Sequence, residues 1–197
     1  MTTEPMVSSP GGPPVRFDVE SSESLSRILI FVKWLLWIPH YIILYLLSYI
    51  VLVITVIAFF AILFTKKYPR GMHNFVVGVA RWNANAYAYV LLLRDEYPPF
   101  SWEPGKYPVS FEIDYPEDLS RWAPLYKWLL VIPNLLVLFI VMIIAILLIV
   151  IGWFAILFTG RLPRGIHDFI EGTMRWYARV YAYVYLLRDE YPPFSMK

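Results

Sequence analysis

The sequence predicts a mainly α-helical membrane protein made of a tandemly duplicated helical-hairpin unit, with short β elements outside the membrane. Three observations predict this class. The chain of 197 residues is 59% apolar and only 16% charged, against about 25% charged residues in a typical soluble domain. Two runs without acidic or basic residues cover 34–65 and 128–160. A shift of 94 residues aligns the chain with itself without a gap.

The composition also disfavours several other classes of protein. The formal net charge of +2 is too small for a nucleic-acid-binding protein, which concentrates Lys and Arg on one face. The absence of cysteine excludes a disulfide framework, a thiolate metal site and a cysteine nucleophile. No phosphate-binding loop, serine-nucleophile elbow or zinc-protease motif is present.

The chain divides into four segments. Residues 1–14 are rich in Pro, Ser, Thr and Gly, which predicts a flexible tail and not a cleavable signal peptide. The first membrane repeat is expected at 15–101, a connecting turn at 102–108 and the second membrane repeat at 109–197.

Each repeat begins with a short alternating segment. Val15–Glu20 and Val109–Asp114 alternate apolar and polar residues, which is typical of a half-buried strand. Residues 100–103 and 107–113 flank Pro104-Gly105, a dipeptide that favours a tight turn. The sequence therefore predicts a hairpin between these two segments.

Either uncharged run would be about 48 Å long as a helix, whereas a bilayer core of ~30 Å needs about 20 residues. Pro39 and Pro133 lie near the start of each run, where proline interrupts or restarts a helix. Lys33 and Lys127 precede them and are expected to extend toward the headgroups. The expected segments are short leading helices at 26–38 and 120–132 and membrane helices at 40–64 and 134–158.

A second helix follows in each repeat, at Gly71–Leu93 and Gly165–Leu187, and is about 34 Å long. Polar residues recur on one face of it, and Glu171 and Arg175 are spaced for an ion pair. This face consists of Asn74, Gly78, Arg81 and Asn85 in the first copy and Asp168, Gly172, Arg175 and Arg179 in the second. These helices either span with the polar stripe inside a bundle, or lie in the interface with the stripe toward the headgroups.

The number of times each repeat crosses the membrane decides whether the two repeats have the same orientation or are inverted. If the ends of each repeat meet at the short strands, each unit crosses an even number of times, which gives about four membrane helices. The basic loops after the two long helices, at 66–70 and 161–164, would then share the cytoplasmic side. The alternative is two spanning and two interfacial helices, which makes the repeats inverted.

The duplication itself is well supported. Between 15–101 and 109–195, 45 of 87 aligned positions are identical. The identities cluster in short motifs instead of being spread along the membrane helices. Duplication in a membrane protein suggests a pseudo-two-fold axis, with any functional residues close to it.

The same motifs carry a family resemblance. Phe-Thr-x-x-x-Pro-Arg-Gly stands at 64–71 and 158–165, Arg-Trp at 81 and 175, and Asp-Glu-Tyr-Pro-Pro-Phe at 95 and 189. In these motifs the chain resembles a prokaryotic membrane family catalogued as domain of unknown function 4389, over both repeats. Lys66 departs from the glycine that this position often carries, as at Gly160. The resemblance implies a membrane location and a repeated helical unit, and it implies no activity.

Two histidines and two arginines are equivalent in the repeats. His73 and His167 follow the loop motif, which comprises Pro69, Arg70 and Gly71 in the first copy and Pro163, Arg164 and Gly165 in the second. They either bind a metal or haem jointly, as in some bundle cores, or hydrogen-bond a loop, which we favour. Arg81 and Arg175 either line a path for an anion or lipid headgroup, or pair structurally with Asp168 or Glu171, which we favour.

The paired carboxylates at 95–96 and 189–190 lie just after a helix and before Pro-Pro. We expect them to form loop ion pairs with Arg94, Arg188 or a basic residue of the other copy. The Tyr-Pro-Pro-Phe segments are expected to be rigid and extended and to anchor the returning chain. Gly71 and Gly165 are expected to permit the tight loop between the helices.

These observations predict a multi-pass protein of the cell membrane without enzymatic activity, cofactor or metal. The first functional hypothesis is a scaffold or accessory subunit of a membrane assembly. The alternative is a small transporter, channel or lipid-handling protein that acts where the repeats meet. The expected partners are membrane lipids and other membrane-protein subunits, and not nucleic acid.

Overall fold

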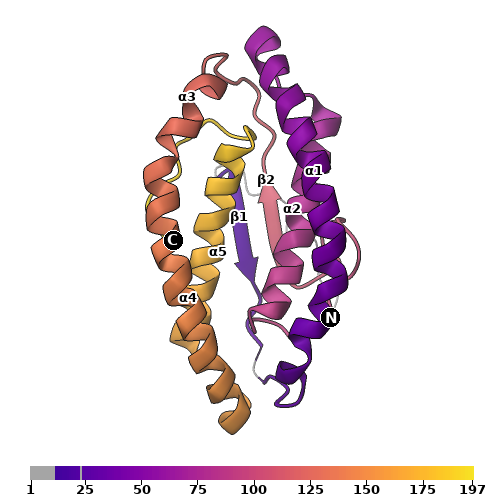
Figure 1. Ribbon diagram of the computed structural model, residues 1–197, viewed down its shortest axis with the longest axis vertical. Coiled ribbons are helices and arrows are strands. Elements are labelled where there is room, and N and C mark those ends of the chain that lie inside the picture. Colours follow the sequence, from indigo (N-terminus) through magenta and orange to yellow (C-terminus); the bar gives the residue numbers. More distant parts are fainter. Residues whose placement is uncertain (1–11, 23) are drawn as a thin grey trace.

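The computed structural model describes residues 12–22 and 24–197, and it is mainly helical with one small sheet (Figure 1). Most of the predicted tail at 1–14 lies outside the described residues. The elements in order are β1 (Val15–Val19), the 3₁₀ turn η1 (Leu29–Phe31), α1 (Lys33–Thr65), α2 (Arg70–Val90), β2 (Val109–Ile113), α3 (Ala123–Leu130), α4 (Ile132–Thr159) and α5 (Arg164–Val184).

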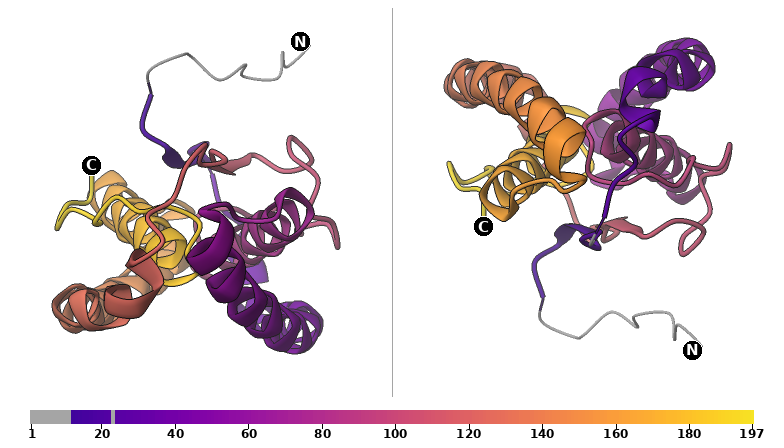
Figure 2. Two further views of the ribbon diagram at one scale, coloured as in Figure 1. Left: turned by 90° about the horizontal axis from the view of Figure 1, so that it is seen from above. Right: turned by 90° about the horizontal axis from the view of Figure 1, so that it is seen from below.

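The elements form three layers, which Figure 2 shows end-on. The sheet lies on one side, α2 and α5 lie in the middle, and α1 and α4 lie on the far side. Each long helix packs on the second helix of its own repeat, whereas β1 packs on α5 and β2 packs on α2. Each repeat therefore places its strand on the helix of the other repeat.

The predicted strands are confirmed, but the predicted hairpin is wrong. β1 and β2 pair with each other in antiparallel register, with Phe17 opposite Phe111. Gly105 does have a positive φ of 73°, as a Pro-Gly turn requires, yet the segment before it is not a strand. Pairing across the repeats is favoured over the predicted hairpin because it buries Phe17 and Phe111 together in the core.

The two repeats run in opposite directions, so that α1 and α4 are antiparallel (Figure 1). The end of α1 meets the chain that leads to α3, since the Leu119 amide donates to the Lys66 carbonyl at 3.0 Å. The end of α4 meets the chain that leads to α1, since the Leu25 amide donates to the Gly160 carbonyl at 2.8 Å. The two basic loops thus lie at opposite ends of the molecule. An even number of crossings in each repeat would require both loops to lie at the same end, and this expectation is wrong.

The long helices begin differently in the two repeats. In the second repeat the chain breaks between α3 and α4, and Pro133 lies in the first turn of α4, as the sequence predicts. In the first repeat α1 runs through Pro39 without a break, so the predicted boundary there is wrong. Pro39 leaves the Leu35 carbonyl without its intrahelical donor, and the neighbouring Leu36 carbonyl accepts a hydrogen bond from the Tyr97 hydroxyl at 3.3 Å.

Within the described residues, α1 and α4 are the two helices that are long and apolar enough to cross a membrane. Both are exposed around most of their circumference, and only 17% of the most apolar stretch of each is buried. In contrast, 12 of the 21 residues of α2 and 10 of the 21 residues of α5 are buried. The prediction of about four membrane helices is therefore not confirmed, whereas the duplicated helical unit is.

Candidate functional site

The polar face of α2 and α5 is covered by the sheet. Arg81 donates from Nε to the Phe111 carbonyl at 2.9 Å and from a terminal nitrogen to the Trp102 carbonyl at 2.8 Å. Arg175 repeats this geometry with the Phe17 carbonyl at 2.9 Å and the Met196 carbonyl at 3.3 Å. Each arginine therefore holds the central strand residue of the other repeat, on either side of the pseudo-two-fold axis.

The second repeat adds carboxylates to this arrangement. Arg175 contacts Glu171 at 2.9 Å and Asp18 at 2.8 Å, which confirms the predicted pair of Glu171 and Arg175. Glu171 also accepts a hydrogen bond from the Val19 amide at 3.1 Å. Asp168 approaches His167 instead, at 3.5 Å. Arg81 has no carboxylate partner among the described residues, so its bonds are to backbone carbonyls alone.

The remaining predicted polar residues have separate surroundings. Asn85 is buried, and its side-chain oxygen has no hydrogen-bond partner in the described part of the chain. Arg179 donates to the carbonyls of Lys197, at 2.6 Å, and Ser195. The loop after the first repeat packs closely against α2, since a Cβ added to Gly78 would lie 3.2 Å from the Trp102 side chain. The predicted polar cluster thus fastens loops and strands to the helices.

The two repeat-equivalent histidines lie at opposite ends, because α2 and α5 begin at opposite ends (Figure 1). His73 is buried between the rings of Tyr68 and Tyr115, with ring centroids 5.7 and 5.0 Å away. Burial lowers the pKa of the His73 imidazole. His167 faces Asp168 and Glu171. A cofactor that both histidines hold jointly is therefore excluded by their separation.

One group of side chains has the composition of a metal site. His167, Asp168 and Glu171 place one ligand atom each within 4.8 Å of one another. Glu171 is already bound by Arg175 and by the Val19 amide. The equivalent residues of the first repeat are His73, Asn74 and Val77, which offer no carboxylate. We assign this group no ion.

The loop motif acts at the start of α2 and α5. Pro69 and Pro163 immediately precede these helices in an extended conformation, and the Arg70 guanidinium lies 4.6 Å from the ring centroid of Tyr115. Arg164 is the first residue of α5. Gly71 and Gly165 are already helical with φ below zero, so the predicted role of these glycines in the loop is wrong.

Two buried lysines form the strongest polar contacts, and the sequence reasoning misplaced them. Lys33 donates to the Arg94 carbonyl at 2.6 Å and pairs with Asp95 at 2.8 Å. Lys127 does the same with Arg188 at 2.7 Å and Asp189 at 2.6 Å. We name each of these sets a lysine clamp.

The lysine clamps are buried, and not extended toward headgroups as the sequence predicts. Lys33 is 2% exposed and Lys127 is 3% exposed. Burial lowers the pKa of the Lys127 ammonium, and the carboxylate of Asp189 opposes that shift. The identity of these lysines and aspartates in both repeats was the signal that could have linked them.

The other carboxylates of the loops follow the prediction. Glu96 binds Arg94 at 2.7 Å, and Glu190 binds Arg188. The hydrogen bond from Arg188 holds the pKa of Glu190 below its ordinary value. Arg94 also donates to the Glu20 carbonyl and Arg188 to the Asp114 carbonyl, so each loop is tied to the segment that follows a strand.

The Tyr-Pro-Pro-Phe segments close the ends of the long helices. In the first repeat, Trp82 donates to Nδ1 of His40 at 3.0 Å, and the Phe100 ring stacks on His40 with centroids 4.1 Å apart. In the second repeat, Trp176 donates to the Asn134 side-chain oxygen at 2.9 Å, and the Asn134 amide donates to the Pro192 carbonyl at 3.0 Å. Both contacts fit the predicted anchoring role.

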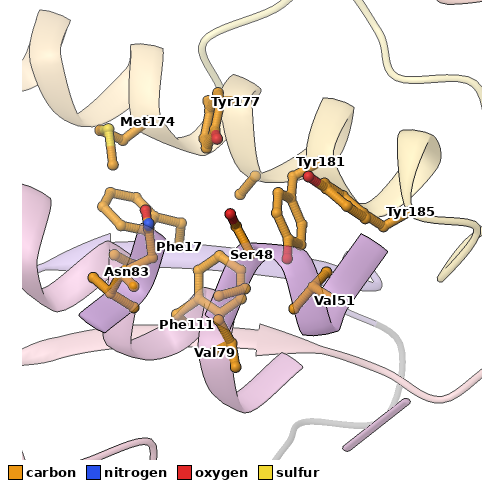
Figure 3. A pocket seen from close by; sticks show the side chains of 14 residues that line it. Phe17, Ser48, Val51, Val79, Asn83, Phe111, Met174, Tyr177, Tyr181 and Tyr185 are labelled. Atoms are coloured by element: carbon orange, nitrogen blue, oxygen red, sulfur yellow. The ribbon is translucent and has the colours of Figure 1, made fainter. Parts of the chain in front are cut away.

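A cavity of about 140 Å³ lies where the repeats meet, between α1, α2 and α5 (Figure 3). Strand residues Phe17 and Phe111 contribute to its wall. Its polar lining comes from Ser48 and Asn83, from Tyr177 and Tyr181 of α5, and from Tyr185 immediately after α5. A second cavity of about 100 Å³ lies between α2, α4 and α5 and is related to the first by the repeat.

The two cavities differ in chemistry because their equivalent residues differ. Ser48 in the first corresponds to Met142 in the second, and Val51 corresponds to Ala145. Tyr177 contributes to both cavities. The first cavity can accommodate a ligand with both apolar and hydrogen-bonding groups, whereas the second is almost entirely apolar.

One protein-family model matches two segments of the chain. The model described as Domain of unknown function (DUF4389) matches residues 27–101 and again residues 121–196. The chain belongs to this family. DUF4389 is present in two tandem copies, which agrees with the resemblance found in the sequence motifs. No curated protein and no solved structure matches the chain significantly.

The two matched segments have a structural meaning. Each DUF4389 copy contains one lysine clamp, one long apolar helix, one polar helix and one Tyr-Pro-Pro-Phe segment. Both strands lie outside the matched residues. The cross-repeat sheet therefore lies outside the two matched segments, and each repeat contributes one strand to it.

Proposed function

We propose that the protein is a non-enzymatic component of a membrane assembly, a scaffold or accessory subunit held in the membrane by α1 and α4. The observation that carries this proposal is where the charged side chains are bound. Arg81 and Arg175 of the polar helices and the lysines of the clamps bind backbone carbonyls or carboxylates of the chain itself. Their charge serves to fix the architecture.

The outer face of the sheet is the surface that we propose for a partner subunit. Arg16 on this face pairs with Glu112 at 2.9 Å and with Asp114 at 2.7 Å. Asp18 is also exposed on this face, and Ser110 is half-buried. Side chains of α2 and α5 bind the edge groups of Phe17, Val19 and Phe111, so the charged face is the part of the sheet that we propose for a soluble or membrane partner.

A native gel of mildly solubilised membranes tests the scaffold proposal. We expect the wild-type chain to migrate within an assembly larger than the monomer. Ser110→Arg adds a bulky charge to the outer face without removing an ion pair, and we expect it to release the chain at the mass of the monomer. Ser24→Arg, which adds the same charge at an exposed loop position outside the sheet, is the matched control. A wild-type chain that migrates only as a monomer contradicts the proposal.

A lipid-handling protein is the second candidate, and the tyrosine-lined cavity favours it. The mixed lining of Ser48, Asn83 and Tyr181 suits a molecule with an acyl chain and a polar group. A transfer assay with labelled lipid between donor and acceptor vesicles tests this candidate. Transfer that Ala84→Phe abolishes by filling the cavity supports it, and a rate equal to that of empty vesicles contradicts it.

The transporter and channel alternative is tested by solute flux in proteoliposomes. Arg81 and Arg175 are the residues that this alternative requires to face a pathway. Flux that exceeds that of empty vesicles, and that the Arg81→Ala/Arg175→Ala variant loses, would favour transport over a scaffold. The scaffold proposal expects no flux in either protein.

A further inference from the structure

The charged face of the sheet lies level with the middle of the long apolar helices. Phe17 and Phe111, at the centre of the sheet, line the same cavity as Val51, which lies near the midpoint of α1. Figure 1 shows the sheet at mid-height between the ends of α1 and α4. If α1 stood upright across a bilayer, Arg16 and Asp18 would therefore lie at the depth of the hydrocarbon core.

An upright orientation is costly for this face. A charged side chain at the centre of a bilayer costs about 2.5–3.5 kcal/mol on insertion scales. Strand edges exposed to lipid do not occur in the hydrocarbon region, because their N–H and C=O groups find no partner there. The sheet has two strands, and on their outer edges only the Phe17 and Phe111 carbonyls and the Val19 amide are bound by side chains of α2 and α5 in the described part of the chain. An orientation that keeps the sheet in water avoids both costs.

The length of the helices points the same way. As a helix, the 33 residues of α1 extend about 50 Å, whereas the hydrocarbon core is about 30 Å thick. An upright α1 would need a tilt far above the average of about 20° for membrane helices. A helix that lies along the membrane has no such limit on its length.

The layers of the fold form one amphipathic body. α1 and α4, which carry most of the exposed large apolar side chains, lie on the side opposite the sheet (Figure 2). α2 and α5 separate these two layers. A body with an apolar side along its full length and a charged side opposite matches a membrane surface, with one side in acyl chains and the other in water.

Basic residues gather at both ends of this body. Near the end of α1 the exposed basic residues are Lys66, Lys67, Arg70 and Arg121, and the exposed acidic residues are Glu117, Asp118 and Glu190. Near the end of α4 the exposed basic residues are Arg27, Arg161 and Arg164, and the exposed acidic residues are Glu20, Glu96 and Asp168. Glu96 is paired with Arg94 and Glu190 with Arg188. Among the remaining exposed charges of the described chain, basic residues outnumber acidic ones at both ends.

An upright orientation would place one of these basic ends outside the cell, against the preference of Lys and Arg for the cytoplasmic side. An orientation along the membrane places both ends at one surface, where anionic headgroups attract each exposed basic residue by about 1 kcal/mol.

We infer that the antiparallel helices α1 and α4 lie along the membrane surface, both within a single leaflet that is rich in anionic lipid. Both basic ends bind headgroups of that leaflet, and the sheet faces the adjacent aqueous compartment. This inference rests on the proposed membrane location. It replaces the multi-pass arrangement that the sequence predicts.

Side-specific labelling of the full chain tests the inference. The natural chain has no cysteine, so the single variants Lys67→Cys, Arg161→Cys and Ser110→Cys carry one thiol each. A membrane-impermeant maleimide is applied to inverted membrane vesicles and to intact spheroplasts. We expect all three thiols to react from the same side. Reaction of Lys67→Cys and Arg161→Cys from opposite sides would overturn the inference and establish two crossings.

Depth-dependent quenching gives an independent measurement. A fluorophore is attached in turn to Leu136→Cys, Ile143→Cys and Ile151→Cys along α4, and lipids with quenchers at known depths are used. We expect the same depth at all three positions. A depth that changes steadily along the helix, from one surface through the midplane, would overturn the inference even if the chain inserts in two orientations.

The same data separate this inference from the proposed membrane location. If the fluorophores on α4 are not quenched by lipid at any depth, and the chain leaves the membrane without detergent, the membrane location itself fails. If quenching is strong but changes with position along the helix, the membrane location stands and only the lengthwise orientation fails.

Lipid retention tests the role of the basic ends. Native mass spectrometry of the purified protein compares the wild type with Lys66→Gln/Lys67→Gln and with Arg161→Gln/Arg164→Gln. We expect each pair of substitutions to reduce retained anionic lipid by a similar amount, and zwitterionic lipid to be unaffected. Retention of anionic lipid that only one pair reduces would contradict a common surface for both ends.

Discussion

The two repeats have the same architecture, and the residues in which they are identical are mostly those that hold backbone in place. Both contain the lysine clamp, the arginine that binds the opposite strand and the tryptophan that contacts the long helix. They differ at many exposed apolar positions of α1 and α4, and where a side chain has a partner in only one repeat, as at His40 and Asn134, or Val77 and Glu171. The comparison separates a shared frame from local chemistry.

The largest effects are expected for the lysine clamps, where the repeats should behave alike. Lys33→Met and Lys127→Met each remove one partner of a buried ion pair and leave Asp95 or Asp189 unpaired. We expect either variant to lower the free energy of unfolding by about 3–5 kcal/mol. Unfolding of the purified protein in detergent, followed by circular dichroism, measures this loss.

The control for the clamps is Lys106→Met. Its ion pair with Glu103 is more than half exposed on both sides, and we expect a change of about 0–1 kcal/mol. If Lys33→Met changes stability no more than this control, then the clamp is not part of the shared frame.

The second effect concerns the arginines, where the repeats should differ. Arg175→Ala removes bonds to two carbonyls and leaves Glu171 without its cation, whereas Arg81→Ala removes bonds to carbonyls alone. We expect each to lose roughly 1.5–3 kcal/mol, with the larger loss for Arg175→Ala, because bonds to charged groups are stronger.

Glu171→Val converts the second repeat to the residue of the first, Val77. In this background we expect Arg175→Ala to have no larger effect than Arg81→Ala, by the same unfolding measurement. An undiminished loss would mean that the carboxylate does not account for the difference between the repeats.

The sequence allows the elements and some pairs to be predicted, but not how the two copies are assembled. The alternation at Val15–Glu20 and the spacing of Glu171 and Arg175 depend on near neighbours, and both predictions are confirmed. The shift of 94 residues establishes which residues are equivalent, yet a parallel and an antiparallel pair of repeats have the same shift. The direction follows from β1 pairing with β2, which no local pattern encodes.

The lysine clamps were missed for a related reason. Lys33 and Asp95 lie 62 positions apart, and a lysine beside an apolar run is expected to extend toward headgroups. Only the fold brings the Arg94 carbonyl to the ammonium. The contacts around Pro39 also come from residues distant in the chain, such as Tyr97, whose hydroxyl binds the Leu36 carbonyl.

A swap at equivalent positions sharpens the comparison further. Asn134 donates to the Pro192 carbonyl, whereas Nε2 of His40 is buried without a partner in the described part of the chain. We expect Asn134→His to lose about 1–2 kcal/mol by removing that donor, and His40→Asn to change stability by less than about 1 kcal/mol. Equal losses from the two substitutions would show that the contact with Pro192 is unimportant.

The smallest effect is expected at the ends of the long helices, where one residue of each repeat adopts the left-handed backbone conformation. Lys66 has φ 60°, and its counterpart Gly160 has φ 71°. A side chain in this conformation costs about 1–2 kcal/mol, whereas glycine adopts it freely. Lys66→Gly is therefore expected to raise the free energy of unfolding by up to about 1 kcal/mol, because the greater freedom of glycine in the unfolded chain offsets part of the gain.

Gly160→Ala is the reciprocal substitution, and we expect it to lose about 1 kcal/mol. Its added Cβ would lie 3.4 Å from the Arg27 guanidinium, which is flexible enough to move, so the loss should come from the backbone conformation. The same unfolding measurement on both variants distinguishes backbone strain from contact. If Gly160→Ala is as stable as the wild type and Lys66→Gly is less stable, then the Lys66 side chain itself stabilises the first repeat.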